Sequence, residues 1–208
     1  MEEVLDVYQA SYDQKHPLIC MDEAAKEIHA DLTAALPMAP GQARREDHHY
    51  GRRGVQAIFC FFDPIRGWRR VSSRDHRRRV DWAQEVRHLL EVDYPEAEVV
   101  TLVCDNLNTH TIASFYAAFD ATTAHRLSRR VRIVHTPRNG SWLNMAEVEL
   151  SVLTRQCIGR RFESAEQMKV GMAKWEAARN RSGAAARWQM TTADARIKLR
   201  GLYPDINC

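Results

Sequence analysis

The chain has 208 residues, of which 45% are hydrophobic and 27% are charged. These proportions exclude a disordered or collagen-like chain, and the length suits one domain with a short appendage. The apolar runs are far shorter than the roughly 20 residues that span a bilayer, so no membrane partner is expected. The first residues, MEEVLDVY, carry acids where an export signal carries lysines. We therefore expect a cytoplasmic protein.

The five cysteines form an odd set without a C-x-x-C pair. Three of them, Cys20, Cys60 and Cys104, lie inside apolar runs that are typical of strands. The pattern argues against a disulfide framework or a zinc site and predicts buried, reduced thiols.

The first half of the chain predicts mainly strands. Residues 1–14 place Val4, Leu5 and Tyr8 at helical spacing before a polar stretch, which indicates a connecting segment outside the core. The run HPLICMDE (16–23) predicts a buried strand that ends in carboxylates. Prolines and glycine predict a loop over 33–47. Two further strands, 54–62 and 68–73, flank a turn and form a hairpin.

Helices and strands alternate in the rest of the chain. We expect a helix over about 75–93 and a second buried strand over 98–104, followed by a helix that Asn108 could cap. A short strand, 131–135, leads to a long helix from Ser141. Ser164 opens another helix with a capping-box sequence, and Thr191 or Thr192 caps the last one. This order favours an α/β fold with a partly parallel sheet.

Arginines are concentrated in two runs, although the net charge is only +3. A field of this density suits a polyanion such as the phosphates of DNA, and a solvated basic face is the alternative. The candidate DNA-binding residues are Arg66, Arg69, Arg70, Arg74, Arg77, Arg78, Arg79, Arg129, Arg130, Arg132 and Arg138.

Two aspartates follow apolar runs of the same design, LICMD (18–22) and TLVCD (101–105). If both runs are central strands, Asp22 and Asp105 emerge near carboxyl ends, where open α/β sheets bind ligands. The two carboxylates would then meet across neighbouring strands. Each aspartate could instead terminate a strand or cap a helix.

Glu147 is a third candidate because of its position on the helix from Ser141. At about 100° per residue, Leu143, Ala146, Leu150 and Leu153 form one apolar stripe. Glu147 falls on the edge of this stripe, and Glu149 falls away from it in solvent. A carboxylate on a core-facing stripe is costly unless it is paired or binds a metal. An arginine partner and a divalent cation both remain open.

Three separated carboxylates without a P-loop favour a hard divalent cation. Magnesium takes oxygen ligands and keeps several waters, so few carboxylates hold it against a phosphate. Two such ions about 4 Å apart would stabilise both the attacking and the leaving oxygen at phosphorus. Together with the arginines, this set of residues is typical of a nuclease.

Three segments resemble the catalytic blocks of DDE transposases, in the bacterial insertion-sequence branch of the mariner superfamily. They are CMDEA (20–24), VCDNLNTH (103–110) and TPRNGSWLNMAEVEL (136–150), and the ending WQMTTADARIKLRGLYP (188–204) is similar to that branch as well. The likeness runs from about Leu5 to Pro204.

The resemblance implies an RNase H-like fold, with a mixed central sheet flanked by helices. It implies DNA cleavage and strand transfer in transposition, with Asp22, Asp105 and Glu147 as catalytic residues and ligands of Mg²⁺ or Mn²⁺, as two ions. The domain would cover 15–180, after a connecting segment (1–14) and before a C-terminal helical extension (181–208). Asn106, His110 and Asn144 would support the site.

The partners implied are the transposon ends and target DNA, bound by a homodimer in the bacterial nucleoid. Members of this branch usually begin with helix-turn-helix modules, and here Met1 falls just before the catalytic block. We therefore expect end recognition to be absent or supplied by a separate chain. The 42 positions from Asp105 to Glu147 exceed the usual spacing, which an insertion near 120–130 would explain. A simple nuclease and a non-catalytic DNA-binding remnant are the alternatives.

Overall fold

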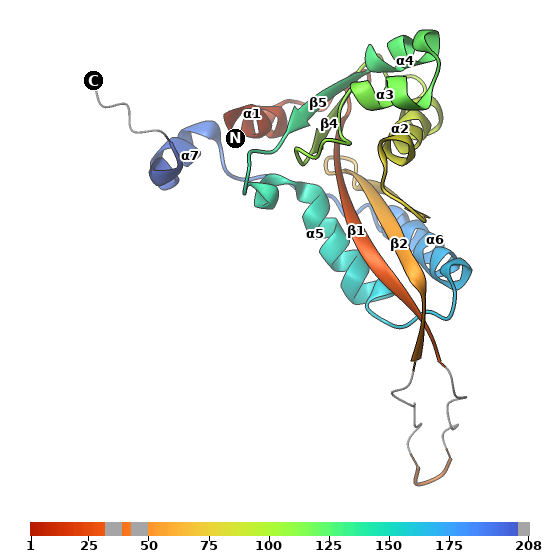
Figure 1. The fold of residues 1–208 in the computed structure, drawn as a ribbon. Helices are drawn as coiled ribbons and strands as arrows, with labels where there is room; N and C mark the ends of the chain where they lie inside the picture. The colour runs from red at the N-terminus through yellow and green to blue at the C-terminus, as the bar shows by residue number, and fades with distance from the viewer. Residues whose placement is uncertain (32–38, 43–49, 204–208) are drawn as a thin grey trace.

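The computed structural model describes residues 1–31, 39–42 and 50–203 (Figure 1). Most of the loop predicted over 33–47 lies outside the described residues, as does Cys208. The other four cysteines are free thiols, and Cys20, Cys60 and Cys104 are buried. The prediction of buried reduced thiols is confirmed for these three.

A five-stranded mixed sheet forms the centre of the fold, in the order β3-β2-β1-β4-β5. Its first three strands, β1, β2 and β3, pair antiparallel, and β4 and β5 continue the sheet parallel to β1. β1 and β2 run on past the other strands as a long ribbon beside α5 and α6 (Figure 1). The strands are β1 (Leu18–Asp31), β2 (Tyr50–Asp63), β3 (Trp68–Arg74), β4 (Val100–Cys104) and β5 (Val131–His135).

Seven α-helices in the described residues surround the sheet, and single helical turns extend several of them. None of the described helices is long and apolar enough to cross a membrane. The predicted helix over 75–93 is α2 with an added π-turn, and Thr191 caps α7 as one of the two expected threonines. The helices are α1 (Glu2–Gln9), α2 (Arg79–His88), α3 (Ala113–Ala118), α4 (Ala121–Ser128), α5 (Met145–Leu153), α6 (Ala165–Ser182) and α7 (Thr192–Lys198).

Alternation along β1 separates two cores. Ile19 and Met21 face a core that includes Trp82 of α2, Phe115 of α3 and Leu127 of α4. Leu18 and Cys20 face the opposite side, where α1, the segment before α5 and α7 pack. Further along the ribbon, α5 and α6 cover that second side. The sheet is therefore buried on both faces, which is why its central strands are nearly continuous apolar runs.

The N-terminal segment belongs to the core, contrary to the expectation that it only connects. Val4 and Leu5 are fully buried, and Tyr8 donates a hydrogen bond of 2.7 Å to the carbonyl of Leu143. Its ring also contacts Trp188 at 5.5 Å. The helix has only three buried side chains, so its apolar residues are too few for the sequence to show that one face is buried. α1 and the C-terminal segment thus pack on each other and on the sheet.

α4 was not predicted as a separate helix. It occupies residues 121–128, the region where an insertion was expected from the long spacing between Asp105 and Glu147. Asp120 caps it through a hydrogen bond to the amide of Thr123. Its buried Ala124 and Leu127 add to the first core.

Glu149 is buried in an ion-pair cluster, so its predicted position in solvent is wrong. Its carboxylate is 4% exposed and lies 3.0 Å from Nε of Arg69 and 3.0 Å from Nε of Arg179. Arg69 is itself fully buried and donates to the carbonyls of Gly67 and Ala184. The cluster ties α5 to β3 and α6.

The error came from the helix start. Residues 141–143 form a 3₁₀ turn, so Leu143 does not share the helical register, and α5 begins at Met145. With Met145 as zero, the buried residues span about 0–140° and Glu149 falls at about 40°, near the middle of that arc. Glu147 falls at about 200°, just outside it.

We expect Glu149→Gln to destabilise the protein by about 3–5 kcal/mol, because it leaves two arginines, one fully buried, without a counter-charge. Urea unfolding measures the change. Glu166→Gln is the matched control, since Glu166 is 78% exposed and pairs with Lys169 at the surface, and it should cost less than about 1 kcal/mol. Equal effects of the two substitutions would contradict a supporting role for the buried cluster.

Candidate active site

Asp22 and Asp105 lie where β1 and β4 separate. The last paired residues of these two parallel strands are Cys20 and Val103, and each aspartate follows its partner by two positions. Because side chains alternate along a strand, both aspartates start from the face of Cys20 and Val103. That face carries the segment that leads into α5. The register of β1 and β4 is therefore consistent with the prediction that the two acids lie across neighbouring strands.

Asn144 brings the start of α5 to the same place. Its side-chain oxygen accepts a hydrogen bond from the amide of Ala146 and caps the helix, while its side-chain nitrogen donates to the carbonyl of Met21 at 2.8 Å. Glu147 lies in the first turn of this helix and is partly exposed. Asn144 is buried. One side chain therefore fixes the first turn of α5 against the residue that precedes Asp22.

The pKa of Asp22 is raised to about 6, mainly by burial. The negative charges of Asp105 and Glu147 also raise it, and a hydrogen bond from the amide of Glu23 lowers it. Like charges oppose ionisation when they lie near one another. The other two candidate acids therefore add to the cost of ionising Asp22.

His110 contacts Asp105 directly. Its Nδ1 lies 2.6 Å from Oδ1 of Asp105, and its Nε2 lies 3.0 Å from Oε1 of Glu23. Burial opposes the charged imidazole, but the hydrogen bonds to Asp105, Cys104 and Glu23 outweigh it and raise the pKa of His110 to about 11. Burial also disfavours the charged form of Asp105, which by itself would raise its pKa. The contact with His110 outweighs burial, so the pKa of Asp105 is lowered. Asp105 is therefore ionised at neutral pH.

The donor set suits a hard cation. Carboxylate oxygens are the ligands that Mg²⁺ prefers, and all three candidate residues are carboxylates. In the described part of the chain, no three His, Cys, Asp or Glu side chains stand close enough together to enclose a metal. In this structure Oδ1 of Asp105 lies against Nδ1 of His110.

Of the expected supporting residues, His110 and Asn144 are buried against the site and Asn106 is exposed. Glu23 is a fourth residue that sequence reasoning did not single out. It follows Asp22 on β1 and points to the opposite face of the strand, where its side chain is 3% exposed. The sequence does contain a hint of this role, because Asp22 and Glu23 are adjacent acids on a strand that is buried on both faces. Adjacent residues of a strand point to opposite faces, so the second acid is buried as well and needs a charged or hydrogen-bonding partner.

Several of the candidate arginines serve the fold. Arg69 is fully buried, and Arg70 is 11% exposed and pairs with Glu85 and Asp93. Neither is available to phosphate, so the DNA-binding role predicted for these two is wrong. Buried acids were the missing partners, which the density of arginines along the chain does not reveal.

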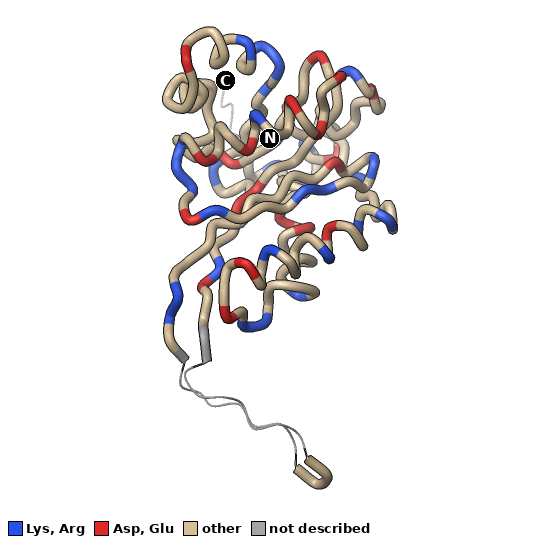
Figure 2. Tube along the Cα trace, turned by 90° about the vertical axis from the view of Figure 1, so that its right-hand side faces the viewer, with Lys and Arg blue, Asp and Glu red and all other residues tan. Residues whose placement is uncertain are grey.

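The remaining candidate arginines differ in their contacts. Arg74 pairs with Glu85, Arg78 with Asp81 and Arg132 with Glu3, while Arg130 donates to three backbone carbonyls and Arg66 lies over the ring of Tyr94. Figure 2 shows basic and acidic positions interspersed over much of the molecule. Four are exposed and form no ion pair within the described residues: Arg77, Arg79, Arg129 and Arg138.

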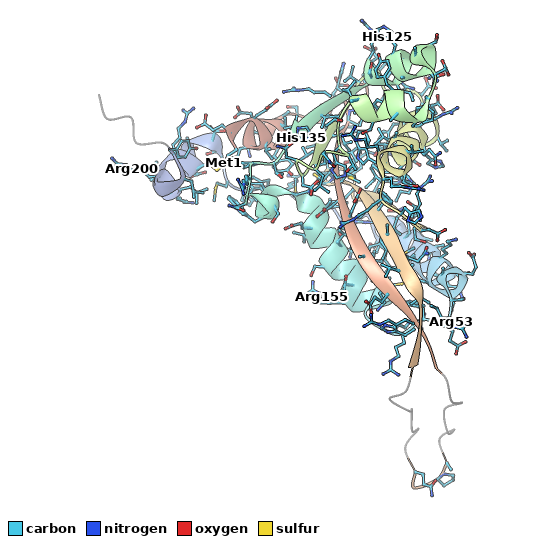
Figure 3. All side chains as sticks on the ribbon, viewed as in Figure 1. Met1, Arg53, His125, His135, Arg155 and Arg200 are labelled. Atoms are coloured by element: carbon cyan, nitrogen blue, oxygen red, sulfur yellow. The ribbon has the colours of Figure 1, made fainter. Side chains whose placement is uncertain are left out.

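Arg138 and Arg129 flank β5 at opposite ends. Arg138 follows the carboxyl end of the strand, beside the end of β4 that carries Asp105; the amide of Thr136 bonds the carbonyl of Cys104 there. His135, which is labelled in Figure 3, is the last residue of β5. Its Nε2 donates a hydrogen bond to the carbonyl of His110. Arg129 precedes β5 and lies at the other end of the sheet. Of these two arginines, Arg138 is therefore the one at the end of the sheet where Asp105 follows β4.

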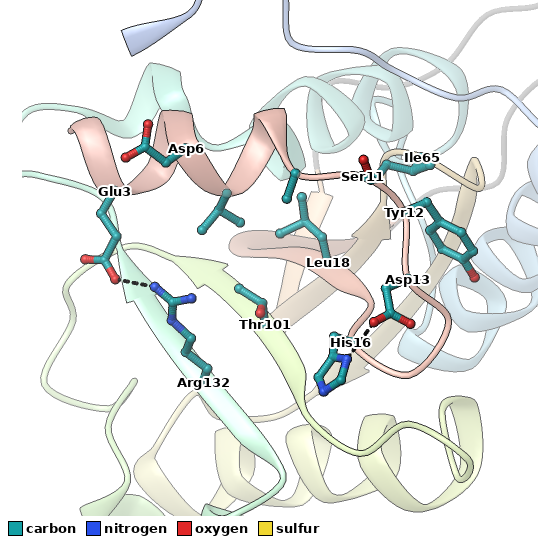
Figure 4. Close-up of a pocket in the computed structure, with 12 residues that line it drawn as sticks. Glu3, Asp6, Ser11, Tyr12, Asp13, His16, Leu18, Ile65, Thr101 and Arg132 are labelled. Carbon is teal, nitrogen blue, oxygen red and sulfur yellow. Dashed lines mark hydrogen bonds and ion pairs between the residues drawn. The ribbon is translucent and has the colours of Figure 1, made fainter.

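A cavity of about 560 Å³ lies at the opposite end of the sheet from the three acids (Figure 4). It is bounded by α1 and the beginnings of β1 and β4, with Leu18 and Thr101 in its wall. An ion pair between Arg132 and Glu3 closes one side. The cavity contains none of the candidate catalytic residues.

We expect Asp22→Asn to stabilise the metal-free protein at pH 7–8. The folded pKa of about 6 lies above the ordinary value of 3.8, so the parent binds this proton more tightly when folded and loses stability as the pH rises from about 4 to 6. Asparagine removes that loss, which is at most about 3 kcal/mol at 1.36 kcal/mol per pKa unit. Thermal melts of both proteins from pH 4 to 8 test this. A constant difference across that range would contradict it.

The chain matches the family model described as DDE superfamily endonuclease over residues 17–169. No protein with curated function matches it. The matched segment contains Asp22, Asp105 and Glu147, and it ends within α6.

Three solved structures illustrate the likeness in fold. The mariner Mos1 paired end complex with Mg superposes with a TM-score of 0.57 at 17% identity, over 98% of this chain and 61% of the other. The Mos1 Strand Transfer Complex gives 0.55 at 15%, over 88% and 54%. The Mos1 paired end complex with Mn gives 0.55 at 16%, over 88% and 55%.

These superpositions confirm the RNase H-like fold predicted from the sequence, with a mixed sheet flanked by helices. The chain spans between half and two thirds of the length of the three Mos1 chains. The family model covers well over half of this chain. The protein therefore belongs to the DDE superfamily endonuclease family.

Proposed function

We propose that this chain is a transposase catalytic domain that cleaves DNA phosphodiesters and transfers the cut strand, with Mg²⁺ or Mn²⁺ as cofactor. The observation that supports the proposal is the register of two neighbouring parallel strands: Asp22 and Asp105 each follow the last paired residue of their strand by two positions. Asn144 ties the first turn of α5, which carries Glu147, to Met21 beside them. Within the family, the segments 20–24, 103–110 and 136–150 favour the bacterial insertion-sequence branch of the mariner superfamily.

The three carboxylates would hold the cation, and two ions are the arrangement we favour. When bound, the metal would neutralise charge on the phosphate and lower the pKa of a water. Two contacts support this assignment: Asn144 fixes the turn that carries Glu147, and the pairing of β1 with β4 ends two residues before Asp22 and two before Asp105. Arg138 would hold the phosphate backbone beside the acids.

The Mos1 structures named above are a paired-end complex and a strand-transfer complex of that protein. By analogy we propose transposon ends and target DNA as the substrates here, bound by a homodimer, with sequence-specific end recognition supplied outside residues 15–180. Binding by this chain alone would then show little sequence preference, because phosphate contacts carry no sequence information.

A simple nuclease is the second candidate function, since the same carboxylates support cleavage without joining. Joined products in a strand-transfer assay distinguish the two. A non-catalytic DNA-binding remnant is a third, and it predicts binding without any nicking.

We expect Glu147→Gln to abolish Mg²⁺-dependent plasmid nicking while the fold and the DNA affinity stay near those of the parent. Glutamine keeps the length of the side chain but removes an anionic ligand. Because Glu147 is partly exposed and lies outside the buried arc of α5, packing changes little. The assay compares both proteins in Mg²⁺ and Mn²⁺ with thermal melts beside it.

Glu163→Gln is the control for this substitution, because Glu163 is exposed and lies in the connection before α6. It should nick as the parent does. If the parent itself never nicks, the remnant function replaces the catalytic one. If Glu147→Gln nicks normally, the assignment of Glu147 is wrong.

We expect Arg138→Ala to weaken DNA binding and to reduce the slope of log K against log salt by about 1, the effect of losing one phosphate contact. Arg129→Ala is the matched control, since it removes an exposed arginine at the far end of the same strand. Fluorescence anisotropy with a labelled duplex at several salt concentrations gives both slopes. Equal losses for the two variants would contradict a DNA path across the carboxyl end of β5.

A further inference from the structure

A buried histidine joins two acids across the end of the sheet. Nδ1 of His110 lies 2.6 Å from Asp105 and Nε2 lies 3.0 Å from Glu23. The side chains of His110 and Glu23 are 1% and 3% exposed, whereas that of Asp105 is 36% exposed. Both ring nitrogens are therefore occupied by acids, one fully buried and one at the surface of the site.

The ring of His110 has little freedom to turn. It stacks on Trp82 with 5.6 Å between ring centroids and 28° between ring planes. Its backbone carbonyl lies 2.8 Å from Nε2 of His135. Trp82 is fully buried in the first core. The position of Oδ1 of Asp105 is thus set by groups that are themselves held in the core.

We propose that Glu23 is a positioning residue that holds the carboxylate of Asp105 for the metal through His110. This inference rests on the proposed function, because it assumes that Asp105 is a metal ligand. Asp105 follows the last residue of β4. The contact of Oδ1 with His110 restricts the rotation of this carboxylate, which is 36% exposed and so remains accessible to a cation.

β1 carries both a candidate metal ligand, Asp22, and the positioning residue, Glu23, at adjacent positions. Asp22 starts from the face of β1 that α5 approaches, and Glu23 starts from the face that packs on α2 and α3. One residue would thus bind the metal and the next would orient a second ligand from behind. Partners of metal ligands typically change metal affinity by 10–100-fold when they are removed.

The test is Mn²⁺ binding to the full chain without DNA, measured by calorimetry. We expect Glu23→Ala to weaken binding by about 10–100-fold, and Glu23→Gln to recover most of the affinity because its amide oxygen still accepts from Nε2. Glu27→Ala is the matched control. Glu27 lies on the same strand and also pairs with a histidine, His29, at 2.9 Å, but it is 46% exposed and four residues farther along.

Nitrogen-15 NMR of the metal-free protein gives a second readout. Glu23→Ala should shift the ring nitrogens of His110, and Glu27→Ala should not. Should Glu23→Ala not fold, Glu23→Leu fills the same buried volume without a polar atom and takes its place. If neither folds, or if melting temperature falls while Mn²⁺ affinity stays that of the parent, the role of Glu23 is structural and the inference is overturned.

Asp105→Asn separates this inference from the proposed function. If Asp105→Asn abolishes Mn²⁺ binding and Glu23→Ala leaves it unchanged, the proposed function stands and the inference is overturned. If Asp105→Asn binds Mn²⁺ as the parent does, Asp105 is not a ligand, and the proposed function fails together with the inference.

Discussion

The burial of charged groups against the central sheet is the constraint that the other contacts of this structure have to satisfy. Burial makes the ionised form of Asp22 costly, and the charges of Asp105 and Glu147 add to that cost. Two apolar cores cover both faces of the sheet around these residues. The burial of these apolar side chains offsets the cost of the charges.

Separate contacts fix the elements that carry the acids. Asn144 connects α5 to β1, and His110 connects the end of β4 to Glu23 and the first core. At its other side, α5 is tied to β3 and α6 by Glu149 with its two arginines. Glu147 and Glu149 are two residues apart and differ in their surroundings: Glu147 is partly exposed, and the charge of Glu149 is neutralised within the fold.

Much of the fold could be predicted because apolar runs and helix caps are local signals. The strand over 131–135 coincides with β5, and Ser164 caps α6 through the amide of Gln167 as its sequence indicates. Segments whose packing is decided at a distance could not be predicted this way. α1 carries only three buried residues, and their partners lie at the other end of the chain.

The strand ends that carry Asp22 and Asp105 could be predicted from the sequence, and the role of the three acids as a metal site stays a prediction. The supporting contacts of the site could not be predicted, because each joins residues that are distant in sequence. Arg69 and Glu149 are eighty positions apart, as their numbers show, and neither indicates the other. A dense run of arginines looked like a surface for phosphate, yet part of it neutralises buried acids of α2 and α5.

The edge of the sheet at β3 is occupied by side chains of α6. Asn180 accepts a hydrogen bond from the amide of Arg69 and donates one to its carbonyl, and Glu176 accepts from the amide of Val71. The side-chain amide of Asn180 thus makes the two hydrogen bonds to the backbone of Arg69 that a neighbouring strand would otherwise make. An extended peptide therefore finds these backbone groups already satisfied. The sheet does not grow at this edge by strand addition, which protects the molecule from edge-to-edge aggregation.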